Sequence, residues 1–313
     1  MSKSRFSNSN EPAISISAVV YQPEAFDEGG RYPAIVVTHP GGGVKEQASG
    51  LYAKKLAKQG LVAIAYDASY QGESSGEPRQ LENPHVRTED ISAVIDYLGG
   101  LPYVDSDRIG AMGICAGAGY TVNAAIDDPR IKAVGMVSAV NIGAMFRNGW
   151  DGGSKNADAA PLVAMAADAR SKEAAGAAPQ LFPLAPPREE DAPNEELRQA
   201  WEYYHTPRAA CATAPGYMTT RSLSQIVPYD AYAGAETYLT QPIQIVAGSE
   251  ASSKCMSDDL FARAASADKH FHIVDGANHM QLYDGENEVN EAISVLAPFF
   301  AQRLGLAGGS QSE

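Results

Sequence analysis

The sequence predicts an α/β fold: a mostly parallel central sheet flanked by helices, with an inserted helical segment. Short apolar runs of strand length recur along the 313 residues, and segments with the spacing of a helix face lie between most of them. This alternation favours a parallel sheet covered on both faces, whose buried strands read as continuous apolar runs. The alternation stops after residue 140 and resumes after residue 240, which indicates an insertion between two strands.

The predicted strands are apolar runs of suitable length, and the predicted helices carry apolar residues at intervals of three and four. We expect strands at residues 14–21, 34–38, 61–66, 108–114, 132–140, 242–247 and 270–274. We expect helices at residues 46–59, 88–98, 116–126 and 288–301.

The inserted segment, residues 141–240, is rich in Ala, Pro and acidic residues and has no clear strand pattern. Residues 161–175 and 194–204 have helical spacing, and Asn194 is well placed to cap the second helix. The segment is therefore predicted to be a helical lid. The Pro-rich stretch 178–193 is either part of this lid or a disordered excursion.

This pattern divides the chain into a core, a lid and two tails. The predicted core is residues 12–140 and 241–304, the lid is residues 141–240, and residues 1–11 and 305–313 are expected to be flexible tails.

Composition and charge argue against several classes of protein. A hydrophobic content of 44% is enough for a packed interior, and a net charge of −14 disfavours nucleic acid or an anionic membrane surface as the main partner. The polar N-terminus lacks the apolar stretch of a signal peptide, and no window is long and apolar enough for a membrane span. The odd number and wide spacing of Cys115, Cys211 and Cys255 fit neither a disulfide framework nor a metal site. We therefore expect a cytoplasmic protein with no metal and no other cofactor.

Cys115 stands where a predicted strand meets a predicted helix. Gly113 and Gly117 lie two residues on either side of it, in a G-x-C-x-G pattern. A nucleophile held on such a sharp turn needs small neighbours, because the turn leaves no room for side chains. A free cysteine is more often a small buried apolar residue, but the order of strand, turn and helix favours a nucleophilic thiol.

A second segment, Gly72-Glu-Ser74-Ser-Gly76, matches the serine version of this pattern. Ser74 lies well past the end of the preceding strand, and Pro78 follows it without a helix. We therefore interpret Ser74 as part of a solvated loop.

The chain order of nucleophile, acid and histidine points to His279 as the base. It lies in a Gly-containing loop between the last predicted strand and the final helix. The other five histidines lie in strands, at strand ends, in loops or in the lid, where they need no catalytic role: His39, His85, His205, His270 and His272.

The glycine-rich turn Thr38-His-Pro-Gly-Gly-Gly43 follows an early strand, where this kind of architecture places an oxyanion donor. Backbone N–H groups near Gly41 and Gly42, together with that of Ala116, are expected to form the oxyanion hole. The alternative is a flexible turn without a catalytic role.

Glu250 is the predicted acid, because it is the carboxylate in the turn after strand 242–247. A solvated loop glutamate is the competing interpretation. A Cys and His pair also functions with a weak third member, since a thiolate forms far more readily than an alkoxide.

Several of these segments together resemble a known family. They are His39-Pro-Gly-Gly-Gly-Val-Lys-Glu-Gln47, Tyr66-Asp-Ala-Ser-Tyr-Gln-Gly-Glu-Ser74, Gly113-Ile-Cys-Ala-Gly-Ala-Gly-Tyr120 and Ala277-Asn-His279. They are similar to the α/β-hydrolase superfamily in its dienelactone hydrolase-like branch, and within it to the group of bacterial YcjY-type hydrolases and fungal polyketide acyltransferases. The resemblance covers about residues 12–304 and is densest over residues 38–120.

The resemblance implies a Cys nucleophile, a His base and an acid after the seventh strand, which map to Cys115, His279 and the loop of Glu250. Relatives often carry an aspartate two residues beyond Glu250, where this chain has Ser252. The acid has therefore either moved to Glu250 or been lost.

These observations predict a hydrolase that cleaves an ester, thioester or lactone through an acyl-cysteine intermediate. Acyl transfer to an alcohol or amine is one alternative, and a non-catalytic binding protein on a hydrolase fold is another. A small-molecule acyl substrate with an apolar portion is expected, and a homodimer is possible for such a fold. The lid residues that favour an apolar substrate are Met145, Phe146, Trp150, Trp201, Tyr203 and Tyr204. The residues expected to pin the walls of the site through ion pairs and polar contacts are Lys45, Glu46, Gln47, Arg79 and Glu82.

Overall fold

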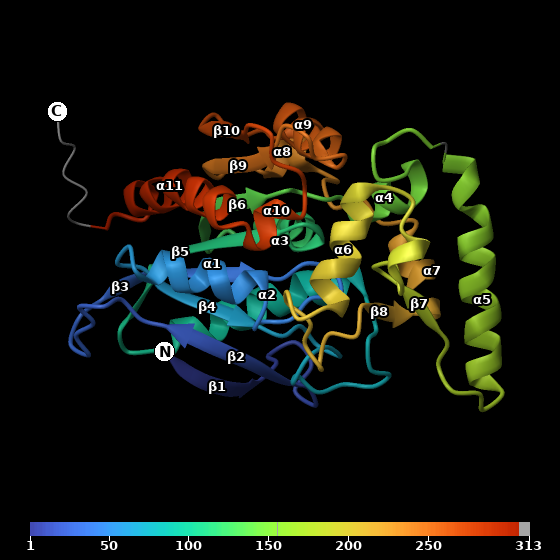
Figure 1. Ribbon diagram of the computed structural model, residues 1–313. Helices are drawn as coiled ribbons and strands as arrows, with labels where there is room; N and C mark the ends of the chain where they lie inside the picture. The colour runs from blue at the N-terminus through green and yellow to red at the C-terminus, as the bar shows by residue number, and fades with distance from the viewer. Residues whose placement is uncertain (155, 307–313) are drawn as a thin grey trace.

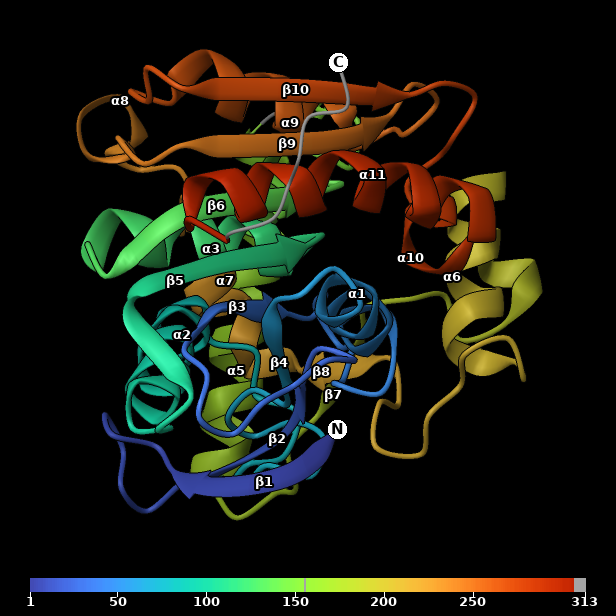
Figure 2. The same cartoon turned by 90° about the vertical axis from the view of Figure 1, so that its left-hand side faces the viewer.

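The computed structural model describes residues 1–154 and 156–306. Its central sheet has eight strands in the order β1-β2-β4-β3-β5-β6-β9-β10. β1 and β2 pair antiparallel, as do β2 and β4, and the other neighbours pair parallel. Figure 2 shows β1 and β10 at opposite edges. The strands are β1 (Ser2–Ser7), β2 (Ser15–Tyr21), β3 (Tyr32–Thr38), β4 (Val62–Tyr66), β5 (Val104–Ile114), β6 (Ile131–Val137), β9 (Ile243–Gly248) and β10 (Lys269–Val274).

Helices cover both faces of the sheet (Figure 1). On one face α1 (Ala48–Ala57) contacts α11 (Glu286–Arg303), and α10 (Gln281–Asp284) leads into α11. On the other face α2 (Pro84–Gly99) packs on α3 (Ala116–Asp127), followed by α8 (Ala235–Tyr238) and α9 (Lys254–Arg263). The inner strands β2, β3, β4, β6 and β9 are almost completely buried, as their continuous apolar runs predicted, whereas the edge strands β1 and β10 are partly exposed. The mostly parallel α/β sheet and all seven predicted strands are confirmed.

The insertion joins β6 to β9, which are neighbours in the sheet. It lies beyond the carboxyl ends of the parallel strands, where the green and yellow segments of Figure 1 gather. The predicted lid helices appear as α5 and α6, and the Asn194 side chain caps α6 by accepting the Leu197 N–H at 2.9 Å. The elements of the lid are α4 (Ile142–Asn148), α5 (Ala160–Ala174), β7 (Leu181–Pro183), α6 (Glu195–His205), β8 (Tyr217–Thr219) and α7 (Leu223–Ile226).

One prediction about an irregular segment is wrong, and one alternative that the sequence left open is excluded. Residues 1–11 are not a flexible tail, because β1 pairs with β2 along its whole length and the buried Asn8 donates to the Asp90 carboxylate at 2.7 Å. The Pro-rich stretch 178–193 is not a disordered excursion, since it contains β7, which pairs with β8. β1 is largely polar and β7 has only three residues, so neither contains an apolar run of the length typical of a strand. Of the predicted C-terminal tail, residues 307–313 lie outside the described residues.

Within the described ranges, none of the helices combines the length and the apolar character that crossing a membrane requires.

Candidate active site

Cys115 sits at a strained turn between β5 and α3. Its backbone angles are φ 57° and ψ −127°, which side chains rarely adopt. The turn is closed by hydrogen bonds from the Cys115 N–H to the Val137 carbonyl at 3.0 Å and from the Val140 N–H to the Cys115 carbonyl at 3.1 Å. A side chain at Gly113 would collide with the Gly117 backbone, and one at Gly117 would collide with His39. The glycines are therefore required by packing, as the elbow interpretation predicted.

The thiol is buried, with 8% of Cys115 exposed. Burial raises the pKa of Cys115 to about 11. Interactions of the sulfur with the Tyr283 hydroxyl and with the backbone N–H groups of Ala116 and Gly41 lower the pKa and so act in the opposite direction. At neutral pH the resting group is therefore a thiol, and these three groups lie beside the sulfur.

The predicted oxyanion donors Ala116 and Gly41 are thus brought together beside the sulfur. The Ala116 N–H belongs to the first turn of α3, which has no carbonyl one turn earlier to bind. Gly42 has a conformational role in the structure: its φ is +69°, and a side chain there would meet Leu184. A donor role for its amide stays a prediction.

His279 lies in the loop between β10 and α10 and is fully buried. Burial lowers the pKa of His279 to about 3, so the imidazole is neutral. Its Nε2 atom is 3.2 Å from the Tyr283 hydroxyl, and its Nδ1 atom is 2.6 Å from Ser253 Oγ. The Trp150 ring covers it, with the two ring centroids 4.9 Å apart.

The structure does not bring Glu250 to His279. The Glu250 side chain is exposed, and the residue is tied to this loop by its backbone N–H, which donates to the Ala277 carbonyl at 2.9 Å. Ser253 occupies the position of the orienting group instead. A hydroxyl can fix the orientation of the ring but carries no charge to stabilise an imidazolium, so the third member of this site is electrostatically weak.

Glu196 is a carboxylate near the site that sequence reasoning missed. It belongs to α6 of the lid, is only 7% exposed, and accepts the backbone N–H groups of His279 at 3.2 Å and Ser252 at 3.1 Å. It therefore binds the backbone of two loops, the one that carries His279 and the one that carries Ser253. Its place at the start of an amphipathic helix gave no signal of this contact.

His39 belongs to the support of the oxyanion turn. Its Nε2 atom accepts the Ala68 N–H at 3.2 Å and its Nδ1 atom contacts the Pro40 carbonyl at 2.7 Å. Arg87 donates to the His39 carbonyl at 2.8 Å and pairs with Glu82 at 2.9 Å. Burial, and then the positive charge of Arg87, hold the pKa of His39 well below its usual value.

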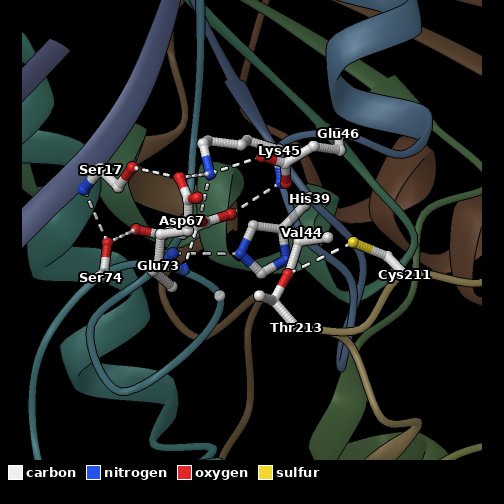
Figure 3. Close-up of polar contacts among 12 residues, drawn as sticks. Ser17, His39, Val44, Lys45, Glu46, Asp67, Glu73, Ser74, Cys211 and Thr213 are labelled. Atoms are coloured by element: carbon white, nitrogen blue, oxygen red, sulfur yellow. Dashed lines mark hydrogen bonds and ion pairs between the residues drawn. The ribbon is translucent and has the colours of Figure 1, made fainter. Parts of the chain in front are cut away.

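A buried ion cluster holds the other end of the same turn (Figure 3). The Lys45 ammonium contacts Asp67 at 2.7 Å, Glu46 at 2.7 Å and Glu73 at 2.8 Å. The side chains of Lys45 and Asp67 are both completely buried. Because Lys45 and Gly41 lie in one short turn, the cluster fixes the backbone that carries the oxyanion donor. Of the residues expected to pin the walls of the site, Lys45 and Glu46 thus form ion pairs here.

Ser74 is part of this support and not a second nucleophile. Its hydroxyl donates to the Asp67 carbonyl at 2.7 Å and accepts the Ser17 N–H at 2.8 Å, as Figure 3 shows. It is 2% exposed, so its interpretation as a solvated residue is wrong, although the conclusion that it is not the nucleophile agrees with these bonds.

A cavity of about 430 Å³ opens above the sulfur, between the core and the lid. Of the lid residues named from the sequence, Met145, Phe146, Trp150 and Tyr204 line it. Tyr203 instead packs against Tyr283, with ring centroids 5.1 Å apart. The wall is mainly apolar and includes Val140, Ile142, Leu162, Phe182, Leu184, Leu197 and Met280.

In the part of the chain that the structure describes, no group of three or more His, Cys, Asp or Glu side chains is placed to hold a metal ion. The three cysteines are free thiols.

Comparison with known proteins identifies the family. The pattern of the dienelactone hydrolase family matches residues 16–137. The uncharacterised protein YcjY of Escherichia coli (strain K12) is 68% identical over 302 residues, which cover 96% of this chain and 99% of YcjY. The uncharacterised protein PA2218 of Pseudomonas aeruginosa is 34% identical over 303 residues, covering 94% of this chain and 79% of PA2218.

Solved structures share the overall fold. The crystal structure of PA2218 has a TM-score of 0.87 at 32% identity and covers 96% of this chain and 93% of its own. The α/β hydrolase GrgF from Penicillium sp. sh18 has a TM-score of 0.79 at 17% identity, with 97% and 99% covered, which shows the shared fold.

Two more distant relatives carry functional names. The quorum-quenching protein AidA of Acinetobacter baumannii is 26% identical and covers 87% of this chain and 86% of AidA. The acyltransferase drtE of Aspergillus calidoustus is 33% identical over 108 residues, which are 34% of this chain and 35% of drtE. On the strength of its likeness to YcjY and PA2218 over nearly its whole length, the chain belongs to the dienelactone hydrolase-like family of α/β-hydrolases.

Proposed function

We propose that this protein is a cysteine hydrolase that cleaves esters or thioesters of apolar acyl groups through an acyl-cysteine intermediate. The observation that carries the proposal is the position of Cys115: a thiol on a strained elbow, beside two free-standing backbone donors, at the floor of an apolar cavity. A site that had lost its activity would have no need for a backbone conformation that costs free energy.

In the proposed reaction the Cys115 sulfur attacks the carbonyl carbon of the substrate. The thiol proton is finally taken up by His279. The negative charge that forms on the carbonyl oxygen rests on the N–H groups of Ala116 and Gly41. The leaving group departs as an alcohol or thiol after it takes up the proton. A water molecule, deprotonated in the same way, then releases the acid and restores the thiol.

The electrostatics favour substrates with a good leaving group. Burial raises the pKa of Cys115 and lowers that of His279, so the resting pair is neutral and the thiol must lose its proton during the attack. Thioesters and activated esters react more easily in such a site than amides, because their leaving groups depart with less protonation by an acid. The apolar cavity wall supports an aliphatic or aromatic acyl group.

Acyl transfer is the second candidate. The lid covers the cavity, and exclusion of water would lengthen the life of an acyl-cysteine until an alcohol or amine arrives. The name of the relative drtE, an acyltransferase, supports this reaction type over part of the chain.

The test is a series of p-nitrophenyl esters and acyl thioesters of increasing chain length, with release of the free acid as the readout. We expect turnover by the wild type and by Cys211→Ala, and none by Cys115→Ala. Leu162→Trp, which fills the cavity, should shift the preference to shorter acyl groups. Turnover that survives in Cys115→Ala would refute the proposal, as would the absence of turnover across the whole series with and without an added alcohol or amine.

A further inference from the structure

Tyr283 lies between the two groups that must exchange a proton. It belongs to α10, four residues after His279, and its hydroxyl is 3.2 Å from the Nε2 atom of that residue. The same hydroxyl interacts with the Cys115 thiol, and both residues line the cavity. One oxygen atom therefore faces both the nucleophile and the base.

Both ring nitrogens of His279 have partners other than the thiol: Nδ1 contacts Ser253 and Nε2 contacts Tyr283. Among the hydrogen bonds of residues 1–154 and 156–306, none joins the Cys115 sulfur directly to His279. Cys115 and Tyr283 are among the residues that line the cavity, whereas His279 is fully buried behind the Trp150 and Tyr283 rings. The Tyr283 hydroxyl therefore contacts the imidazole nitrogen and lines the cavity together with the thiol.

We propose that Tyr283 is a catalytic residue that relays the proton from the Cys115 thiol to His279 during acylation. This inference rests on the proposed cysteine hydrolase function. The S–H bond breaks as the sulfur attacks, and its proton forms a new O–H bond on Tyr283. The original hydroxyl proton of Tyr283 moves to Nε2 of His279. Tyr283 is neutral before and after the step, the imidazole becomes an imidazolium, and no other reactant is needed.

The surroundings of Tyr283 suit a relay better than a separate acid. Burial raises its pKa well above the usual value, so a free tyrosinate is disfavoured and the hydroxyl must gain one proton as it gives up another. The ring is held by Tyr203, with centroids 5.1 Å apart, and its hydroxyl also interacts with Tyr204. These contacts fix the oxygen between its two partners.

The neighbouring Tyr203 provides a matched control. Its ring packs against Tyr283, but its hydroxyl accepts the Ala48 N–H at 3.0 Å and does not face the sulfur. Tyr283→Phe and Tyr203→Phe therefore remove one hydroxyl each from the same aromatic cluster, and the relay requires only the hydroxyl of Tyr283.

The experiment measures the pre-steady-state burst of p-nitrophenol from p-nitrophenyl acetate, together with its rate in mixtures of H2O and D2O. We expect Tyr283→Phe to slow the burst at least tenfold at unchanged substrate affinity, and Tyr203→Phe to stay within threefold of the wild type. The wild-type rate should depend on the D2O fraction along a curve, because two protons move together, and Tyr283→Phe should give a straight line. Site-specific 3-fluorotyrosine at position 283, which keeps the hydroxyl, should stay within threefold of the wild type.

A Tyr283→Phe burst as fast as that of the wild type would overturn the relay, as would equal losses in the two Phe variants. If Tyr283→Phe fails to fold, the fluorotyrosine protein and the curvature of the wild-type D2O dependence decide the question, and a straight wild-type line overturns the relay. The proposed function is tested separately, because it fails only if the wild type shows no burst or if Cys115→Ala keeps one.

Discussion

Ser253 Oγ lies 2.6 Å from Nδ1 of His279, so a hydroxyl holds the position from which a carboxylate would usually orient a catalytic imidazole. The arrangement fixes the ring without adding charge. It leaves a histidine whose pKa is lowered to about 3 by burial beside a thiol whose pKa is raised to about 11. The pair is therefore poised for a concerted proton transfer and not for a resting ion pair.

Substitution of Ser253 tests this orienting role. Ser253→Ala removes a hydrogen bond whose net value is about 0.5–1.5 kcal/mol, so we expect acylation to slow by roughly two- to tenfold. Ser253→Asp should raise the pKa of His279 and speed acylation at neutral pH. The matched control is Glu250→Gln, because the Glu250 side chain is exposed, and its rate should stay within twofold of the wild type. Burst kinetics give all three rates. A large loss of acylation rate in Glu250→Gln would show that Glu250 is the acid of the site.

Glu196 couples the lid to the catalytic loops. Glu196→Ala would leave the N–H groups of His279 and Ser252 without their acceptor, at a cost of about 1–3 kcal/mol for each buried group that water cannot reach. We expect a lower unfolding free energy in urea and a lower kcat/KM. The control is Glu195→Ala in the same helical turn, whose side chain pairs with Arg198 at the surface. Equal effects in the two variants would contradict the coupling.

Lys45 is a charged side chain whose replacement is expected to cost much stability. Lys45→Met would leave the fully buried Asp67 carboxylate without its cation, which costs roughly 3–5 kcal/mol of stability. Lys254→Met breaks an exposed pair with Asp258 one helical turn away and should cost about 0.5 kcal/mol. Urea denaturation measures both. A loss below about 1 kcal/mol for Lys45→Met would show that the cluster does not hold the oxyanion turn.

The depressed pKa of His279 predicts how stability depends on pH. The folded state binds fewer protons than the unfolded state between pH 6.5 and about pH 3, so the unfolding free energy falls as the pH drops through this window. His279→Gln lacks this term. The raised pKa of Asp90, about 6, acts in the opposite direction but is present in both proteins. We therefore expect the stability difference, wild type minus variant, to decrease by at most about 1.4 kcal/mol per pH unit below pH 6.5. Parallel stability curves would contradict the buried, neutral histidine.

The sequence predicted the parts of the molecule that depend on local pattern. The buried strands and the elbow at Cys115 carry their signals in apolar runs and in glycines that the backbone requires. β1 was missed because it is a largely polar edge strand, in which Phe6 stacks on Tyr97. Ser253, Glu196 and Tyr283 were missed for another reason. Each contacts His279 or Cys115 only because the folded loops and lid bring it there, and such contacts leave no pattern in the sequence.

The central claim is that Cys115 carries the acyl group, and mass spectrometry of the protein after a brief reaction with a short acyl thioester tests it most directly. Digestion then assigns any added mass to the peptide of Cys115, Cys211 or Cys255. The account predicts one acyl group on the Cys115 peptide of the wild type, formed and lost at rates that match turnover, and none in Cys115→Ala. An acyl group on another residue, or turnover by the wild type without any acylated Cys115 at early times, would contradict it.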